Sequence, residues 1–142
     1  MDREATLAFF AQYRAAFDRL DADAVADLWH AGSGIADSRG GHGRLTWWAD
    51  DADMRANHRA LCAHYRASGY HHAEFELVDH QALGADHAFA RLRWSLWRGD
   101  GSLLQRFHTA YQLMRGVDGP RVLLATAYQE DLAAMAGARE KR

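Results

Sequence analysis

The chain has one cysteine and one proline among 142 residues, and neither sign of charge dominates. A lone thiol, Cys62, cannot form an intramolecular disulfide, so a reducing compartment is expected. The formal net charge is −2 and the basic residues are scattered along the chain. This pattern excludes the clustered basic surface that nucleic-acid binding requires.

Long hydrophobic runs are also missing. No stretch approaches the roughly 18 apolar residues that a membrane-spanning helix needs. The chain begins with the charged residues Asp2, Arg3 and Glu4 and lacks an apolar segment that ends in a small-residue cleavage site. We therefore expect a soluble, cytoplasmic protein without a membrane partner.

Hydrophobic residues make up 49% of the chain and aromatic residues 11%, enough to fill one core. No repeat, linker or low-complexity segment interrupts the sequence. We predict a single domain over residues 1–142.

Three helices are predicted in the first half of the chain. Apolar residues spaced by three and four predict a helix over residues 2–20, with Asp2 as its cap. A second, shorter helix starts at Asp21. Its apolar stripe consists of Val25, Leu28 and Trp29, and Gly32 and Gly34 are expected to end it. A third helix starts at Asp50 or Asp51 and ends at Ser68-Gly69. One side of that helix carries Met54, His58, Leu61, Cys62 and Tyr65.

Strands are predicted in two groups. Residues 35–37 and 44–47 form two short strands around a glycine cluster, which lacks the GxGxxG spacing of a phosphate loop. After Gly69 the apolar period changes to two, which predicts long strands over residues 71–81, 86–98, 103–115 and 121–129. Three turn sequences join them as antiparallel hairpins: Gly84-Ala85-Asp86, Gly99-Asp100-Gly101 and Asp118-Gly119-Pro120. Helices followed by hairpin-linked strands indicate an α+β fold.

Two stretches carry a resemblance to a known superfamily: FFAQYRAAFDRLDADAVADLWHAGSGIADSRG, residues 9–40, and AYQLMRGVDGPRVLLATAYQED, residues 110–131. With the element order, they resemble the nuclear transport factor 2-like (NTF2-like) superfamily over about residues 5–132. That superfamily includes ketosteroid isomerases, SnoaL-type polyketide cyclases and scytalone dehydratase. The resemblance implies a cone-shaped fold in which three N-terminal helices pack on a strongly curved, mostly antiparallel sheet.

The resemblance also implies catalytic residues. The isomerases have a tyrosine on the first helix and an aspartate on the first strand, and Tyr13 and Asp37 match these positions. Tyr13 would donate to a developing enolate, and a desolvated Asp37 with a raised pKa would be the base. Alternatively, Asp37 ends its strand and bonds its own turn, and Tyr13 bonds a strand backbone. Gln112 stands near the place of a third family residue, a protonated aspartate.

Other polar residues are candidates for the same pocket. His108 and Gln112 share one strand face with Arg106, which the resemblance places inside the cone. His108 is a candidate acid or base, or else a hydrogen-bonded core histidine. His58 resembles the pocket histidines of dehydratases, or is simply packed on its helix. Three aromatic residues, Trp29, Tyr65 and Trp94, are expected to contact the substrate.

No metal or cofactor is predicted. The HxH, HExxH and CxxC spacings are missing, and side chains alone perform acid–base chemistry. Two aromatic stripes are expected on the outer face of the sheet, Phe89 with Trp97 and Phe107 with Tyr111 and Leu113. Such a face is costly in water, so we expect a homodimer built on it.

The leading hypothesis is a SnoaL-like enzyme that acts on a small, apolar carbonyl compound by isomerisation, cyclisation or dehydration. The alternative is a non-catalytic module of the same fold that binds a hydrophobic ligand or a partner protein. A third possibility is a stable domain whose pocket residues are all structural. A sealed pocket filled by Trp29, Tyr65 and Trp94 would favour the module. An open cavity in which Asp37 and Tyr13 converge within hydrogen-bond reach of one ligand atom would favour the enzyme.

Overall fold

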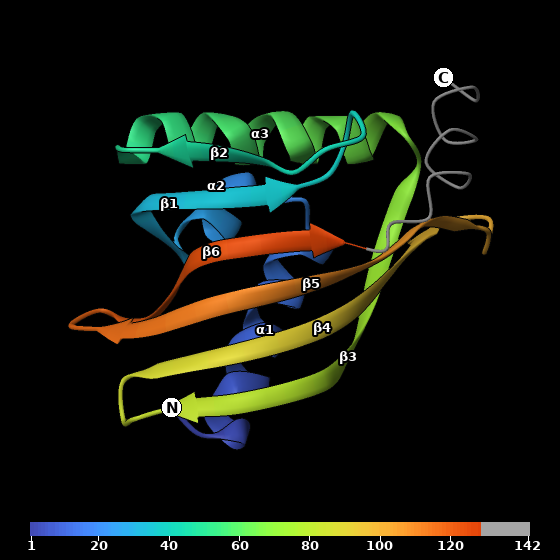
Figure 1. The fold of residues 1–142 in the computed structure, drawn as a ribbon. Coiled ribbons are helices and arrows are strands. Elements are labelled where there is room, and N and C mark those ends of the chain that lie inside the picture. Colours follow the sequence, from blue (N-terminus) through green and yellow to red (C-terminus); the bar gives the residue numbers. More distant parts are fainter. Residues whose placement is uncertain (129–142) are drawn as a thin grey trace.

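The computed structural model describes residues 1–128, which form three helices and one six-stranded sheet (Figure 1). In chain order the elements are α1 (Arg3–Asp18), α2 (Ala22–Ala26), β1 (Trp29–Asp37), β2 (Arg44–Trp48), α3 (Asp51–Ala67), β3 (Tyr70–Leu83), β4 (His87–Arg98), β5 (Leu103–Gly116) and β6 (Gly119–Tyr128). Gln129, the predicted end of the last strand, lies outside the described residues.

The sheet has the strand order β2-β1-β6-β5-β4-β3. Only β1 and β6 pair in parallel, and the other neighbours are antiparallel. Figure 1 shows the sheet bending, with α1 and α2 behind it and α3 running alongside β2. The predicted α+β class, with three helices on a curved and mostly antiparallel sheet, is confirmed.

Each helix begins at an aspartate whose carboxylate accepts a hydrogen bond from a backbone N–H three residues later. Asp2 caps α1 at 2.8 Å, Asp21 caps α2 at 3.1 Å and Asp50 caps α3 at 2.9 Å. These bonds satisfy backbone donors that have no partner within the helix. The helix starts predicted from sequence are therefore correct. The predicted end of α3 is correct too, because Ser68 is its C-cap and Gly69 follows with φ +85°.

The predicted end of the second helix is wrong. α2 stops at Ala26, and Trp29 is the first residue of β1, whose nine residues include both glycines expected to end the helix. Pairing with β6 decides this, because Val122 N–H donates to the Leu28 carbonyl at 2.8 Å and Trp29 lies opposite Val122. Pairing with a distant strand here outweighs the helical spacing of Val25, Leu28 and Trp29 in the sequence.

The predicted orientation of β5 is also wrong. His108 is only half-buried and Gln112 is exposed, whereas Thr109, Tyr111 and Leu113 are buried on the opposite face. His108 and Gln112 thus face away from the helices. Period two predicts that alternate residues share a face but not which face is covered. Here the apolar residues of β5 turn inward to pack against the helices.

One of the two stripes proposed for a homodimer is therefore inside the molecule. Phe89 and Trp97 do alternate with buried residues of β4 and lie on the outer face. The same face carries ion pairs between β4 and β3, Arg91 with Asp79 at 3.5 Å and Arg93 with Glu76 at 3.9 Å. The homodimer stays a prediction. The outer apolar surface on which it was based is smaller than expected, because only one of the two stripes lies there.

Gly34 lets β2 approach β1 closely. A Cβ at this position would lie 2.7 Å from Cε3 of Trp47 and 3.0 Å from the Thr46 carbonyl oxygen. Gly116, near the end of β5, has no atom within 4 Å of such a Cβ.

We predict that Gly34→Val lowers the free energy of unfolding by about 1–3 kcal/mol, because its methyl groups displace the indole and a backbone carbonyl. Gly116→Ala, the matched strand control, is expected to stay within about 0.5 kcal/mol. Urea denaturation measures both. Equal midpoints for Gly34→Val and the wild type would contradict the close approach.

Candidate active site

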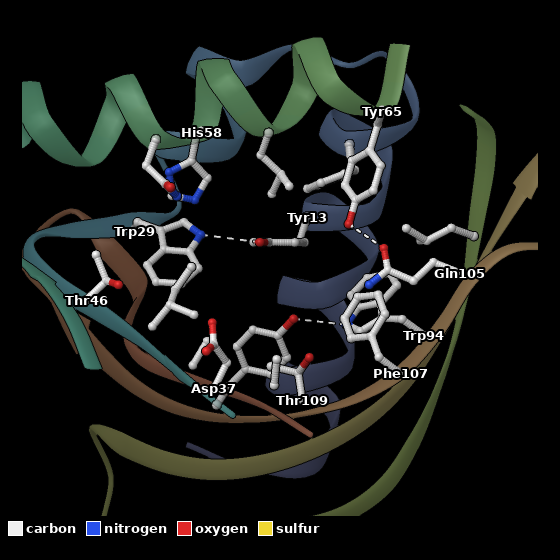
Figure 2. A pocket seen from close by; sticks show the side chains of 18 of the residues that line it. Tyr13, Trp29, Asp37, Thr46, His58, Tyr65, Trp94, Gln105, Phe107 and Thr109 are labelled. Atoms are coloured by element: carbon white, nitrogen blue, oxygen red, sulfur yellow. Dashed lines mark hydrogen bonds between the residues drawn. The ribbon is translucent and has the colours of Figure 1, made fainter. Parts of the chain in front are cut away.

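A cavity of about 240 Å³ lies between the helices and the inner face of the sheet (Figure 2). This volume is just below the range of roughly 300–1,000 Å³ found for most ligand pockets, so a small ligand fits best. Apolar side chains form most of the wall, among them Phe17, Ile35, Leu61, Leu96 and Phe107. The wall of this cavity is therefore largely apolar.

Six of the eight predicted site residues line this cavity: Tyr13, Trp29, Asp37, His58, Tyr65 and Trp94. The other two, His108 and Gln112, do not, because they lie on the outer face of β5. In their place β5 presents Gln105, Thr109 and Tyr111 to the cavity. The apolar alternation of Phe107, Tyr111 and Leu113 was the signal in the sequence that could have identified this inner face.

Tyr13 is held by an indole. Its ring is buried on the inner face of α1, and its hydroxyl oxygen accepts a hydrogen bond from Nε1 of Trp29 at 3.3 Å. An indole N–H only donates, so the phenol keeps its own proton for another acceptor. Burial raises the pKa of Tyr13 far above its usual value, and the hydroxyl therefore stays a donor.

Tyr111 repeats this arrangement on the sheet. Its hydroxyl accepts from Nε1 of Trp94 at 2.9 Å, and burial raises its pKa as well. The ring centroids of Tyr13 and Tyr111 are 6.3 Å apart. The Thr109 side chain, which also lines the cavity, lowers the pKa of Tyr111 by less than burial raises it. Two neighbouring phenols thus present O–H groups in one apolar space.

His58 is oriented by its own helix. Its Nδ1 lies 3.0 Å from the carbonyl oxygen of Met54, and the ring packs on Trp29 with centroids 4.9 Å apart. Because a carbonyl only accepts, Nδ1 carries the proton in the neutral ring and Nε2 carries the lone pair. Burial lowers the pKa of His58 below 6.5, which favours the neutral form. Nε2 has no hydrogen-bond partner among residues 1–128 and lies in a side chain that lines the cavity.

Asp37 lines the cavity, but its electrostatics differ from the expectation. Its Oδ1 accepts from Nε of Arg44 at 2.6 Å and its Oδ2 from Nη2 at 3.3 Å. Oδ1 also accepts from the backbone N–H of Arg39 at 3.2 Å, a contact within its own turn. The hydrogen bond from Arg44 lowers the pKa of Asp37 below 3.8, so the predicted raised pKa is wrong. β1 and β2 pair with Asp37 opposite Arg44, which places the guanidinium there.

Tyr65 and Gln105 form a buried pair at another part of the wall. The Tyr65 hydroxyl donates to Oε1 of Gln105 at 2.9 Å, and only 3% of Gln105 is exposed. Tyr65 was predicted as a site residue, whereas Gln105 was not. Within the described part of the chain, no group of three or more His, Cys, Asp or Glu side chains is placed to hold a metal ion, and no helix is long and apolar enough to cross a membrane.

We predict that His58 titrates below pH 6.5 and that its neutral ring is protonated at Nδ1, which ¹⁵N NMR of the imidazole measures. Below pH 6.5 the unfolded chain binds more protons than the folded one, so stability falls on acidification until the lowered pKa is passed. His58→Asn should remove this part of the pH dependence. A neutral ring protonated at Nε2 would contradict the assignment.

Solved structures share this fold. An NTF2-like protein with a cystatin-like fold from Novosphingobium aromaticivorans superposes with a TM-score of 0.68 at 23% identity, over 98% of this chain and 87% of the other. A ketosteroid isomerase-like protein from Erwinia carotovora atroseptica gives 0.62 at 14% identity, over 89% and 96%. A putative calcium/calmodulin-dependent protein kinase type II association domain from Thiobacillus denitrificans gives 0.65 at 20% identity, over 84% and 90%.

At these identities the likeness shows the fold alone. No curated protein matches the chain in sequence. A family model described as NTF2-like protein (DUF6841) matches residues 3–130. The predicted resemblance to the NTF2-like superfamily is thereby confirmed, and the chain belongs to the NTF2-like family DUF6841.

Proposed function

We propose that the protein is a cofactor-independent enzyme that moves a proton on a small, largely apolar carbonyl compound. The observation that carries this proposal is the imidazole of His58, whose Nδ1 is occupied by the Met54 carbonyl and whose Nε2 has no partner among the described residues. A neutral, buried imidazole with a bare nitrogen at a cavity wall is suited to general base catalysis.

The proposed hydrogen-bond donor, Tyr13, and this base both contact Trp29. Trp29 contacts the His58 ring and donates to the Tyr13 hydroxyl, so one indole joins the two groups. His58 Nε2 takes a proton from the carbon next to the substrate carbonyl. The C–H electron pair then forms a C=C bond to the carbonyl carbon, and the π pair of the carbonyl moves onto its oxygen. The Tyr13 O–H then donates to the enolate oxygen. In an apolar cavity such a hydrogen bond is stronger than in water.

The protonated imidazole completes the reaction. In a β,γ-unsaturated ketone the enolate is a dienolate, and return of the proton to its far carbon gives isomerisation. In a β-hydroxy ketone the enolate pair forms a C=C bond as the hydroxyl leaves with the imidazolium proton as water, which gives dehydration. Attack of the enolate carbon on a second carbonyl gives cyclisation, and the imidazolium proton then goes to the new alkoxide. All three use the same base and the same donor, and none requires a cofactor.

Asp37 is the competing base. It lines the same cavity, but its bidentate pair with Arg44 lowers its pKa and makes it a weaker base than an unpaired carboxylate. Proton abstraction by Asp37 would cancel the negative charge that Arg44 stabilises. His58 meets no such obstacle, and we therefore assign it the role of base.

The test is deuterium exchange next to the carbonyl of 4-cyclohexylcyclohexanone in D₂O, followed by ¹H NMR. We expect His58→Asn, which can keep the bond to the Met54 carbonyl, to lower enzyme-dependent exchange by about 10²–10⁴-fold. Tyr13→Phe should lower it by about 10²–10³-fold. Exchange should persist in Asp37→Asn. The control is His30→Asn, at an exposed histidine outside the cavity.

Two outcomes would overturn the assignment. Loss of exchange in Asp37→Asn with full exchange in His58→Asn would make Asp37 the base. Tight binding of the ketone without any exchange in the wild type would indicate a binding module, the second candidate function. That candidate is favoured by the Asp37–Arg44 pair, which lowers the pKa of Asp37 and so weakens its carboxylate as a base.

A further inference from the structure

Gln105 presents an unpaired hydrogen-bond donor to the cavity. Tyr65 occupies its Oε1, which turns the amide nitrogen away from the phenol (Figure 2). Nε2 has no hydrogen-bond partner among residues 1–128 and is not among the atoms that the protein fully covers. Since Gln105 is almost fully buried and lines the cavity, this N–H₂ group is accessible from the cavity.

The donor lies far from the proposed base. His58 and Tyr65 are seven residues apart on α3, which is two helical turns or about 10 Å along the axis. Gln105 is fixed to Tyr65, so His58 and Gln105 lie toward opposite ends of the cavity, as Figure 2 shows. Between them the wall is apolar, with Leu61 on the helix and Phe107 on the sheet.

We infer that the substrate is an elongated, apolar molecule with a second, neutral carbonyl oxygen, which accepts a hydrogen bond from Gln105 while the reacting carbonyl lies at Tyr13. Gln105 is then a specificity-determining residue. This inference rests on the proposed function for the reacting end only. The amide donor faces a largely apolar cavity, where a hydrogen bond to a ligand oxygen is stronger than in water.

The second group is neutral for an electrostatic reason. Gln105 and Tyr65 are both uncharged, and the arginines that line the cavity, Arg39 and Arg44, are adjacent to Asp37 at the β1–β2 turn. A carboxylate buried at Gln105 would meet no opposite charge there and would lose its hydration. A ketone or amide carbonyl needs only the N–H that the site offers.

A matched pair of probes tests this. Bicyclohexyl-4,4′-dione has a ketone at each end, and 4-cyclohexylcyclohexanone lacks the distal one. We expect the dione to bind the wild type about 3- to 10-fold more tightly than the monoketone, the effect of one added hydrogen bond. Quenching of the indole fluorescence from Trp29 and Trp94 gives both dissociation constants without any turnover.

Gln105→Leu should abolish the preference for the dione, because it removes the donor for the distal carbonyl. It also removes the acceptor of the Tyr65 hydroxyl, a change that affects both ketones alike. Gln105→Met keeps the length of the side chain and should also lose the preference for the dione. This second variant keeps the test valid if Gln105→Leu does not fold. Tyr65→Phe frees the amide to rotate and should reduce the preference without abolishing it. Thermal unfolding of each variant checks that the fold is retained.

The outcomes separate this inference from the proposed function. Equal affinity of the wild type for both ketones, failure of the dione to bind, or an equal loss for both ketones in Gln105→Leu overturns the role of Gln105, even if deuterium exchange is normal. A preference for the dione that depends on Gln105 supports the inference, even if neither ketone exchanges its protons and the proposed enzyme activity fails.

Discussion

Trp29, the first residue of β1, fixes the positions of two proposed functional side chains, Tyr13 and His58. Its backbone lies opposite Val122 of β6, in the only parallel pairing among the described strands. Its indole donates to Tyr13 on α1 and packs against His58 on α3. One side chain therefore connects the sheet with two helices. A shift of β1 by one residue would turn the indole to the other face and break both contacts.

The polar groups in the cavity share a design in which a protein partner determines which atom is left for the ligand. The Met54 carbonyl binds Nδ1 of His58, so Nε2 remains available to a ligand. Trp94 donates to the Tyr111 oxygen, so the phenol proton remains available. Tyr65 donates to Oε1 of Gln105, so the amide N–H₂ remains available. Because these partners are buried, the directions are fixed before a ligand binds, which lowers the free energy cost of ordering on binding. Asp37 differs, since its partner Arg44 occupies both carboxylate oxygens.

Membership of the NTF2-like family DUF6841 does not by itself assign a reaction. Solved structures with the same fold include a ketosteroid isomerase-like protein and a putative kinase association domain. The difference between an enzyme and a binding module must come from the cavity. In this chain the unoccupied nitrogen of His58 favours chemistry, and the charged pair at Asp37 moves the proposed base from the first strand to the third helix.

The sequence alone determined the elements that depend on neighbours in the chain. Helix caps at Asp2 and Asp50 and the pocket positions of Tyr13 and Asp37 followed from local spacing together with the family resemblance. The tertiary structure decided what depends on distant partners. Period-two alternation shows which residues of a strand share a face but not which face points inward. Only packing against the helices showed that Gln105, and not Gln112, faces the cavity.

The tertiary structure also determines the pKa of Asp37 and the orientation of Trp29. The pKa of Asp37 is lowered because β1 and β2 pair with Arg44 opposite it, a register that local sequence does not specify. Trp29 lies in a strand and not in the predicted helix, because β6, at the far end of the described chain, pairs with it. Local sequence determines helix and turn boundaries through short-range hydrogen bonds, whereas burial, partners and hence reactivity arise only when distant segments meet.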